Sequence, residues 1–152
     1  MFKRILVAID GSRTADRGFK AALNMAKEQD AQLHILHVVD ARAPVLYPDG
    51  SAYVDEIISL LRDGGKKILG KAEAAASSAG VKYKSTMVET MGLPVADVIV
   101  QQAKKLRADV IVLGTHGRRG LSRLVMGSDA EGVLREASVP VMLIKSPPSR
   151  GK

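Results

Sequence analysis

Residues 109–129 read DVIVLGTHGRRGLSRLVMGSD, a short apolar run followed by a connector rich in glycine and arginine. A continuous Val, Ile and Leu run of this length is typical of a strand that is buried on both faces. The connector ends in Gly127-Ser128, where a helical pattern begins. Because a helix N-terminus presents N–H groups and partial positive charge, a strand–loop–helix segment of this kind can bind phosphate.

Apolar runs and helical patterns alternate along the whole chain. The runs predict strands at 4–9, 33–39, 81–89, 109–114 and 139–144. Helical spacing of apolar residues predicts helices at 14–29, 52–79, 94–106 and 128–137, with Gly64-Gly65 as a candidate bend. This order predicts an α/β fold in which a parallel sheet has helices on both faces. Right-handed crossovers limit the layout to a few arrangements.

Composition narrows the function classes. The 152 residues suit about one domain, which we place at 1–146 before a disordered tail at 147–152. The 23 Lys and Arg exceed the 16 Asp and Glu, which favours an anionic partner or simply a basic surface. Only 3% of residues are aromatic, which disfavours binding to single-stranded nucleic acid. With no cysteine, disulfides and thiolate sites are excluded. Since no secretory signal or spanning segment is evident, we expect a cytoplasmic protein without a membrane partner.

Three loops leave the carboxyl ends of expected strands, at Asp10, Asp40 and Gly114. Ligands of open parallel sheets collect at this edge, near the point where the strand order reverses. In the last loop, Gly114 and Gly117 lack a Cβ atom, so the backbone there can adopt positive φ and approach a ligand closely. Arginines can add charge-assisted hydrogen bonds to phosphate, and the loop has three: Arg118, Arg119 and Arg123.

Structural interpretations compete with the binding interpretation. Ser128 begins an S-x-x-E capping box and can simply cap its own helix. Asp10 is equally suited to forming the turn that follows its strand. His34 and His37 are three residues apart on one expected strand, so they point to opposite faces and cannot bind one metal ion together. We interpret each histidine as a packed or edge residue.

The spacing Gly114-x-x-Gly117, nine residues, then Gly127-Ser128 resembles the G-2x-G-9x-G-S/T signature of the ATP-binding branch of the universal stress protein family. The resemblance covers nearly the whole chain, through KRILVAIDGS at 3–12, LHILHVVD at 33–40, MGLPVADVIVQQAKKLRADVIVLGTHGRRG at 91–120 and GSDAEGVLREASVPVMLIK at 127–145. It implies a Rossmann-like open five-stranded parallel sheet in the order 3-2-1-4-5, with ATP or AMP at the switch point, with or without Mg²⁺.

The resemblance also implies which residues contact the nucleotide. The first strand's end would face the ribose and adenine, the second would contact adenine through its backbone, and the glycine loop would flank ribose and phosphates. At position 129 the family commonly has a small or branched apolar residue, whereas this chain has Asp129. Because a carboxylate there repels phosphate, AMP binding or weak binding fits this residue better than tight ATP binding. The implied residues are Ala8, Ile9, Asp10, Val39, Gly114, Thr115, His116, Gly117, Arg118, Gly127, Ser128 and Asp129.

The resemblance implies a regulatory or stress-tolerance module that dimerises through the edge strand at 139–145; the alternative is an edge covered by the tail. An unidentified protein partner would respond to nucleotide occupancy. A second hypothesis is a slow ATP-hydrolysing or adenylyl-transferring enzyme on the same scaffold, although the chain has no G-x-x-x-x-G-K-[ST] loop and no evident general base. A third, a basic nucleic-acid-binding domain, ranks last because the arginines cluster beside a helix start and not along a stacking platform.

Overall fold

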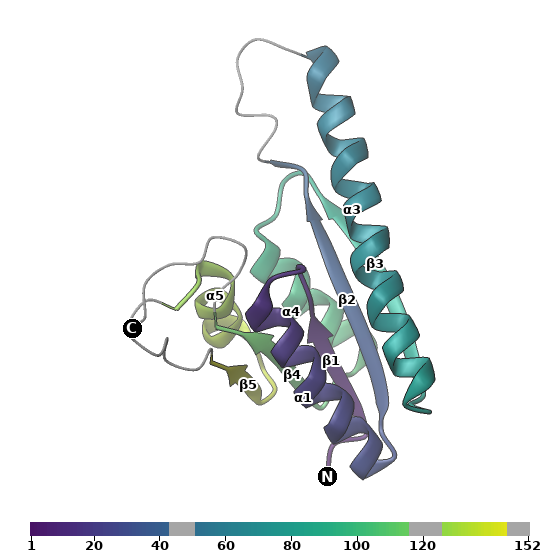
Figure 1. Cartoon of the computed structure of the whole chain (residues 1–152). Coiled ribbons are helices and arrows are strands. Elements are labelled where there is room, and N and C mark those ends of the chain that lie inside the picture. The colour runs from purple at the N-terminus through teal and green to yellow at the C-terminus, as the bar shows by residue number, and fades with distance from the viewer. Residues whose placement is uncertain (43–50, 116–125, 146–152) are drawn as a thin grey trace, which may run out of the picture.

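The computed structural model describes residues 1–42, 51–115 and 126–145, and Figure 1 shows the chain. Helices and strands alternate in these ranges as the sequence predicts. The elements are β1 (Arg4–Ala8), α1 (Arg13–Gln29), β2 (Gln32–Asp40), α3 (Ser51–Ser78), β3 (Tyr83–Thr90), α4 (Val95–Leu106), β4 (Val110–Gly114), α5 (Ser128–Glu136) and β5 (Val141–Ile144). The expected tail at 147–152 lies outside the described residues.

The five strands form one parallel sheet in the order β3-β2-β1-β4-β5. β1 is central, since Leu6 pairs with His34 of β2 on one side and with Ile111 of β4 on the other. The predicted fold class and strand order are confirmed. All five carboxyl ends therefore meet at one edge of the sheet, and the strand order reverses between β1 and β4.

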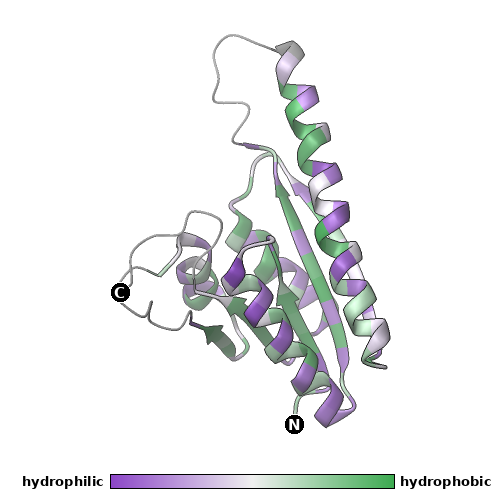
Figure 2. Cartoon of the chain, viewed as in Figure 1, coloured by the Kyte–Doolittle hydropathy of each residue, from purple (hydrophilic) through white to green (hydrophobic). Residues whose placement is uncertain are grey.

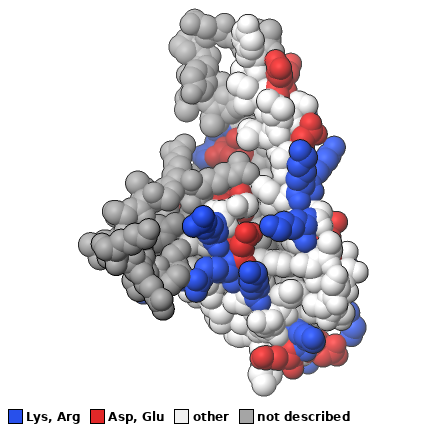
Figure 3. Space-filling model, viewed as in Figure 1, with Lys and Arg blue, Asp and Glu red and all other residues white. Residues whose placement is uncertain are grey.

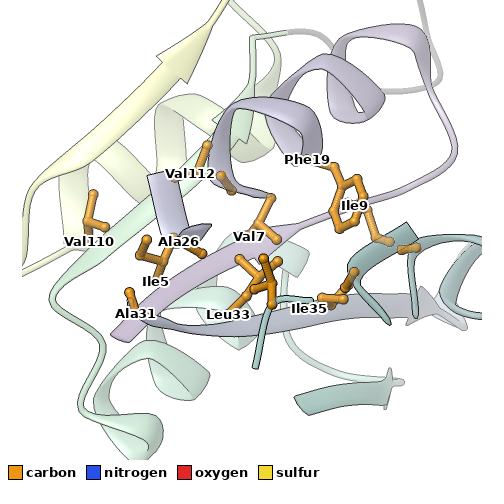
Figure 4. Close-up of a cluster of buried hydrophobic side chains, with 14 of the residues drawn as sticks. Ile5, Val7, Ile9, Phe19, Ala26, Ala31, Leu33, Ile35, Val110 and Val112 are labelled. Carbon is orange, nitrogen blue, oxygen red and sulfur yellow. The ribbon is translucent and has the colours of Figure 1, made fainter. Parts of the chain in front are cut away.

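The sheet is the middle of three layers, with α1 and α3 on one face and α4 and α5 on the other (Figure 1). Alternate residues of β1 enter the two cores: Ile5 and Val7 pack toward α1 and α3, whereas Leu6 packs toward α4 and α5. Figure 4 shows the first of these cores around Val7 and Phe19. β1 and β4, at the middle of the sheet, are apolar along most of their length, as Figure 2 shows, because both of their faces are covered.

Helix α3 is uninterrupted at Gly64-Gly65, so the glycine pair does not break the helix. The two glycines differ in their surroundings. A Cβ atom on Gly65 would lie 2.7 Å from Cδ2 of His37 and 2.9 Å from Sδ of Met87, whereas one on Gly64 would meet nothing within 4 Å. Gly65 therefore allows α3 to lie close against β2 and β3.

A long helix raises the question of membrane insertion. None of the helices in the described ranges combines the length and the apolar composition that crossing a membrane requires.

Candidate functional site

The carboxyl edge of the sheet brings together the chain segments that the sequence singled out. The ends of β1, β2 and β4 reach this edge, and the start of α5 is hydrogen-bonded to the end of β4. Of the predicted site residues, His116, Gly117 and Arg118 lie outside the described residues. The others lie at this edge: Ala8, Ile9, Asp10, Val39, Gly114, Thr115, Gly127, Ser128 and Asp129.

The turn between β1 and α1 is built by Asp10 and Ser12. Oδ1 of Asp10 accepts the Ser12 N–H at 2.8 Å, and Gly11 between them has φ 82°. Oγ of Ser12 then accepts the Ala15 N–H at 3.2 Å and caps α1. The turn-forming interpretation of Asp10 is therefore confirmed. Its carboxylate is held at the carboxyl end of β1, beside the point where the strand order reverses.

His37 fixes the last residue before that turn. Its Nδ1 lies 2.8 Å from the Ile9 carbonyl oxygen, and because a carbonyl can only accept, this nitrogen is the donor. The Ile9 N–H donates to the Leu36 carbonyl at 2.9 Å, so both backbone groups of Ile9 are engaged. The sequence indicated a packed His37, which its 5% exposure confirms, but gave no sign that it positions the end of β1.

Gly114 lets the end of β4 lie close to α1, a role that the sequence did not suggest. Its φ is not positive; among the described glycines only Gly11 and Gly80 have positive φ. A Cβ atom on Gly114 would lie 2.6 Å from the Thr14 carbonyl carbon and 2.8 Å from the Ala15 nitrogen. The close approach is therefore to the backbone of α1, and Gly114 does not adopt the positive φ that a glycine allows.

Thr115 joins the two ends of the glycine-arginine loop. Its N–H donates to the Ile144 carbonyl at 3.0 Å, which extends the β4–β5 ladder. Its carbonyl accepts the Gly127 N–H at 2.7 Å. The start of α5 is thus held beside the end of β4. In this structure the Gly127 N–H therefore has a protein acceptor, so a phosphate contact at this turn would fall to the N–H groups that follow it.

The first turn of α5 opens at the same edge. Gly127 is the N-cap, with φ −59°, and its carbonyl accepts the Glu131 N–H at 3.0 Å. Ser128 is already the first helical residue, so the capping-box interpretation of Ser128 is wrong. Ser128 and Asp129 are exposed. Because the first N–H groups of a helix have no partner inside it, this turn directs backbone donors to the outside of the sheet edge.

Charges beside this turn partly compensate one another. Arg42, just beyond β2, donates from Nε and Nη2 to the carboxylate of Asp40 at 2.8 and 2.7 Å. The hydrogen bond to Asp40 raises the pKa of the Arg42 guanidinium, and the negative charges of Asp40, Asp129 and Asp97 raise it further. Arg42 therefore lies within electrostatic reach of Asp129. Arg42 was not predicted for the site, although its position two residues after Asp40 places it at the strand end.

Two further observations delimit the site. In the part of the chain that the structure describes, no three His, Asp or Glu side chains are grouped so that they could hold a metal ion. A cavity of about 210 Å³ lies at the opposite edge of the sheet, between the end of α4 and the connection from α5 to β5. Its lining includes Lys104, Arg107 and Val139, none of which was predicted for the site.

Comparison with known proteins assigns the family. Residues 1–145 match the Universal stress protein family. The chain belongs to this family. A relative over nearly the full chain is Universal stress protein MJ0531 of Methanocaldococcus jannaschii, which is 40% identical over 148 residues, or 97% of this chain and 84% of that protein.

Solved structures of similar proteins extend the comparison. Hypothetical protein MJ0577 superposes with a TM-score of 0.87 at 27% identity, covering 98% of this universal stress protein and 99% of the other chain. The universal stress protein from Archaeoglobus fulgidus, solved in complex with dAMP, has a TM-score of 0.67 at 26% identity, covering 93% and 97% of the two chains. A universal stress protein solved in complex with cAMP has a TM-score of 0.66 at 25% identity, covering 94% and 97%.

Proposed function

We propose that this universal stress protein binds an adenine nucleotide at the carboxyl edge of its sheet, between β1 and β4, and acts in the cytoplasm as a regulatory module of a stress response. The observation on which this depends is the 2.7 Å hydrogen bond between the Thr115 carbonyl and the Gly127 N–H. It holds a helix N-terminus next to the switch point, where open parallel sheets bind ligands. The two similar proteins that were solved with dAMP and with cAMP support the same ligand class.

The groups at this edge suit the parts of a nucleotide. Ala8 and Ile9 would face the adenine and ribose, and the backbone at Val39 would contact the adenine. The Asp10 carboxylate would accept a hydrogen bond from a ribose hydroxyl. The first-turn N–H groups of α5 and the exposed Ser128 hydroxyl would hold phosphate. Gly127 has no side chain to obstruct that approach. We propose that three residues of the glycine loop also flank the ribose and phosphates: His116, Gly117 and Arg118.

Asp129 determines which nucleotide binds better. A carboxylate in the first turn of α5 repels phosphate, and the repulsion grows with the number of phosphate charges. Arg42 offsets part of this repulsion, because its guanidinium already interacts with Asp129. We therefore propose that AMP binds without a metal ion, and that ATP binds well only when Mg²⁺ on its phosphates neutralises charge next to Asp129.

Isothermal titration with AMP, ATP and ATP plus Mg²⁺ tests this function, together with the variant Gly127→Val. A valine is compatible with φ −59° and ψ 149° at this position, so the fold should persist while the side chain blocks phosphate. We expect nucleotide affinity to fall at least about a hundredfold, which corresponds to about 2.8 kcal/mol.

The matched control is Gly70→Val on α3, where an added Cβ meets nothing within 4 Å. It should bind nucleotide like the parent protein. Absence of saturable binding by the parent protein at millimolar AMP and ATP would reject the proposed function. Equal losses in Gly127→Val and Gly70→Val would reject the placement of the phosphate.

We further propose that the protein is a homodimer that pairs through β5. The carbonyls of Pro140 and Ile144 accept hydrogen bonds from β4. Because alternate residues of a strand direct their backbone groups to opposite sides, Val141 and Leu143 turn theirs outward at the sheet edge. All four side chains of β5 are half-buried in the single chain. A short apolar edge with outward donors favours pairing with a second copy.

A further inference from the structure

Helix α3 extends beyond the sheet (Figure 1), and its N-terminal part exposes large apolar side chains. Tyr53 is 70% exposed, Leu60 is 65% exposed and Ile57 is 39% exposed. Spacings of four and three residues align the three side chains along one side of the helix. We call these three residues the apolar stripe. A contiguous apolar surface on a soluble domain indicates an interaction site.

An ion pair shows which way the apolar stripe faces. Nε of Arg62 lies 2.6 Å from Oε2 of Glu89, so this side of α3 lies over β3, the outer strand of the sheet. At 3.6 residues per turn, the stripe lies about 140–180° around the helix from Arg62. It therefore faces away from β3 and toward solvent.

Unpaired cations continue the same line of α3 and recur on α1. Lys67 and Lys71 follow Leu60 at helical spacing, on the side of α3 that carries the stripe. Arg17 and Lys20 are exposed on α1, whose opposite side is buried. None of the ion pairs found between described residues includes any of these four. Figure 3 shows Lys and Arg side chains gathered over α1 and the middle of α3.

We propose that α1 and α3 together form a docking surface for an acidic amphipathic helix of another protein. Apolar residues of that helix would pack on Tyr53, Ile57 and Leu60. Its carboxylates would pair with the four cations, none of which is in an ion pair found between described residues. The proposal is independent of nucleotide binding, since it uses the outer sides of two helices and none of the residues at the sheet edge.

The arrangement favours a protein partner over a nucleic acid or an anionic membrane. Glu56 is exposed one helical turn before Leu60, next to the apolar stripe. A uniformly anionic partner would be repelled at this end of the surface, although the lysines attract it at the other end. An amphipathic helix avoids the repulsion because it presents apolar side chains to the stripe and acidic ones to the cations.

Fluorescence anisotropy with a labelled synthetic helix of leucine and glutamate, about 18 residues long and with leucines at heptad positions, tests the proposal. We expect saturable binding that weakens between about 50 and 500 mM salt, because screening acts on the charged half. The double variant Lys67→Glu, Lys71→Glu should weaken binding at least about tenfold. Leu60→Ser should weaken it about fivefold and leave the salt dependence unchanged.

The matched control is Lys104→Glu, Lys105→Glu on α4, which makes the same charge change on the opposite face of the sheet. It should alter the affinity by less than about twofold. Thermal melts by circular dichroism establish that each variant is folded.

Three results would overturn the proposal. The first is no saturation at about 100 μM protein, where even a weak interface would be occupied. The second is equal binding of a scrambled peptide of the same composition, or an equal loss in the α4 control. The third is that the protein binds a DNA duplex or phosphatidylserine vesicles more tightly than it binds the peptide, and that the Lys67 and Lys71 substitutions abolish this tighter binding. That result would assign the surface to nucleic acid or lipid.

Discussion

His34 is a buried titratable side chain whose charged form the fold disfavours. It is 5% exposed on β2, and its Nε2 has no hydrogen-bond partner among the described residues. Burial, and secondarily the positive charges of Lys84 and Arg4, lowers the pKa of the imidazole. Because the unfolded chain keeps the ordinary pKa near 6.5, it binds more protons than the folded chain as the pH falls through that value. Folding stability therefore declines on acidification in this range.

The substitution His34→Leu should remove both the unsatisfied nitrogen and this pH dependence. We expect the free energy of unfolding to rise by about 1 kcal/mol at pH 8, because a buried group without a partner is replaced by an apolar one. The gain should be larger at pH 5.5, where the parent protein has lost stability. Urea unfolding of the parent protein and the variant at both pH values measures this gain. If the loss of stability between pH 8 and pH 5.5 were the same in both proteins, His34 would not be the cause of the pH dependence.

At the scale of elements, the contact of α3 with β2 depends on Gly65. The His37 ring beneath it is held by its hydrogen bond to the Ile9 carbonyl and cannot swing away without cost. We expect Gly65→Ala to destabilise the protein by about 1–3 kcal/mol through overpacking. Its neighbour supplies the control: Gly64→Ala should stabilise by about 1 kcal/mol, because Ala is the better helix former and the added methyl meets no atom within 4 Å.

Chemical denaturation of both variants measures this difference, and nucleotide titration adds a second readout. Since His37 also fixes the end of β1, Gly65→Ala should weaken nucleotide binding while Gly64→Ala leaves it unchanged. Two glycine variants with the same stability would show that α3 can shift away from His37 freely.

The elements themselves could be predicted because each follows from a local pattern. Apolar runs near Val7 and Val112 mark strands that are covered on both faces, and their order implies the parallel sheet. The site details could not be predicted in this way. The N-cap of α5 is Gly127 and not Ser128. The N–H of Gly127 donates a hydrogen bond to the carbonyl of Thr115, twelve residues earlier. Spacing marks such a glycine but does not say which backbone it approaches.

The same limit applies to Gly114 and Arg42. The sequence marked Gly114 for a ligand, and the structure shows the backbone of α1 as its neighbour. Arg42 gained importance only when the fold brought Asp97 and Asp129 from other helices to the end of β2. Contacts between elements that are distant in sequence decide these roles, so a pattern within one segment cannot reveal them.

For the whole molecule, the two edges of the sheet differ in a way that decides how copies can pair. The β3 edge is eight residues long and has the charged side chains of Lys84 and Glu89, which discourage strand addition. The β5 edge has only the apolar residues Val141–Ile144. A symmetric dimer through β5 would double the sheet and leave the two charged β3 edges outermost.

The substitution Leu143→Pro tests this assembly, because it removes an outward N–H and spares the hydrogen bonds to β4. We expect the parent protein to sediment as a dimer, at about twice the 16.2 kDa of the chain, and the variant as a folded monomer. Met142→Pro is the contrasting change, because Met142 directs its N–H toward β4 and a proline there removes a hydrogen bond within the sheet. The melting temperature of Met142→Pro should therefore fall further below that of the parent protein than the melting temperature of Leu143→Pro does. A dimer that persists in folded Leu143→Pro would place the interface elsewhere, and a monomeric parent protein at micromolar concentration would rule out pairing through β5.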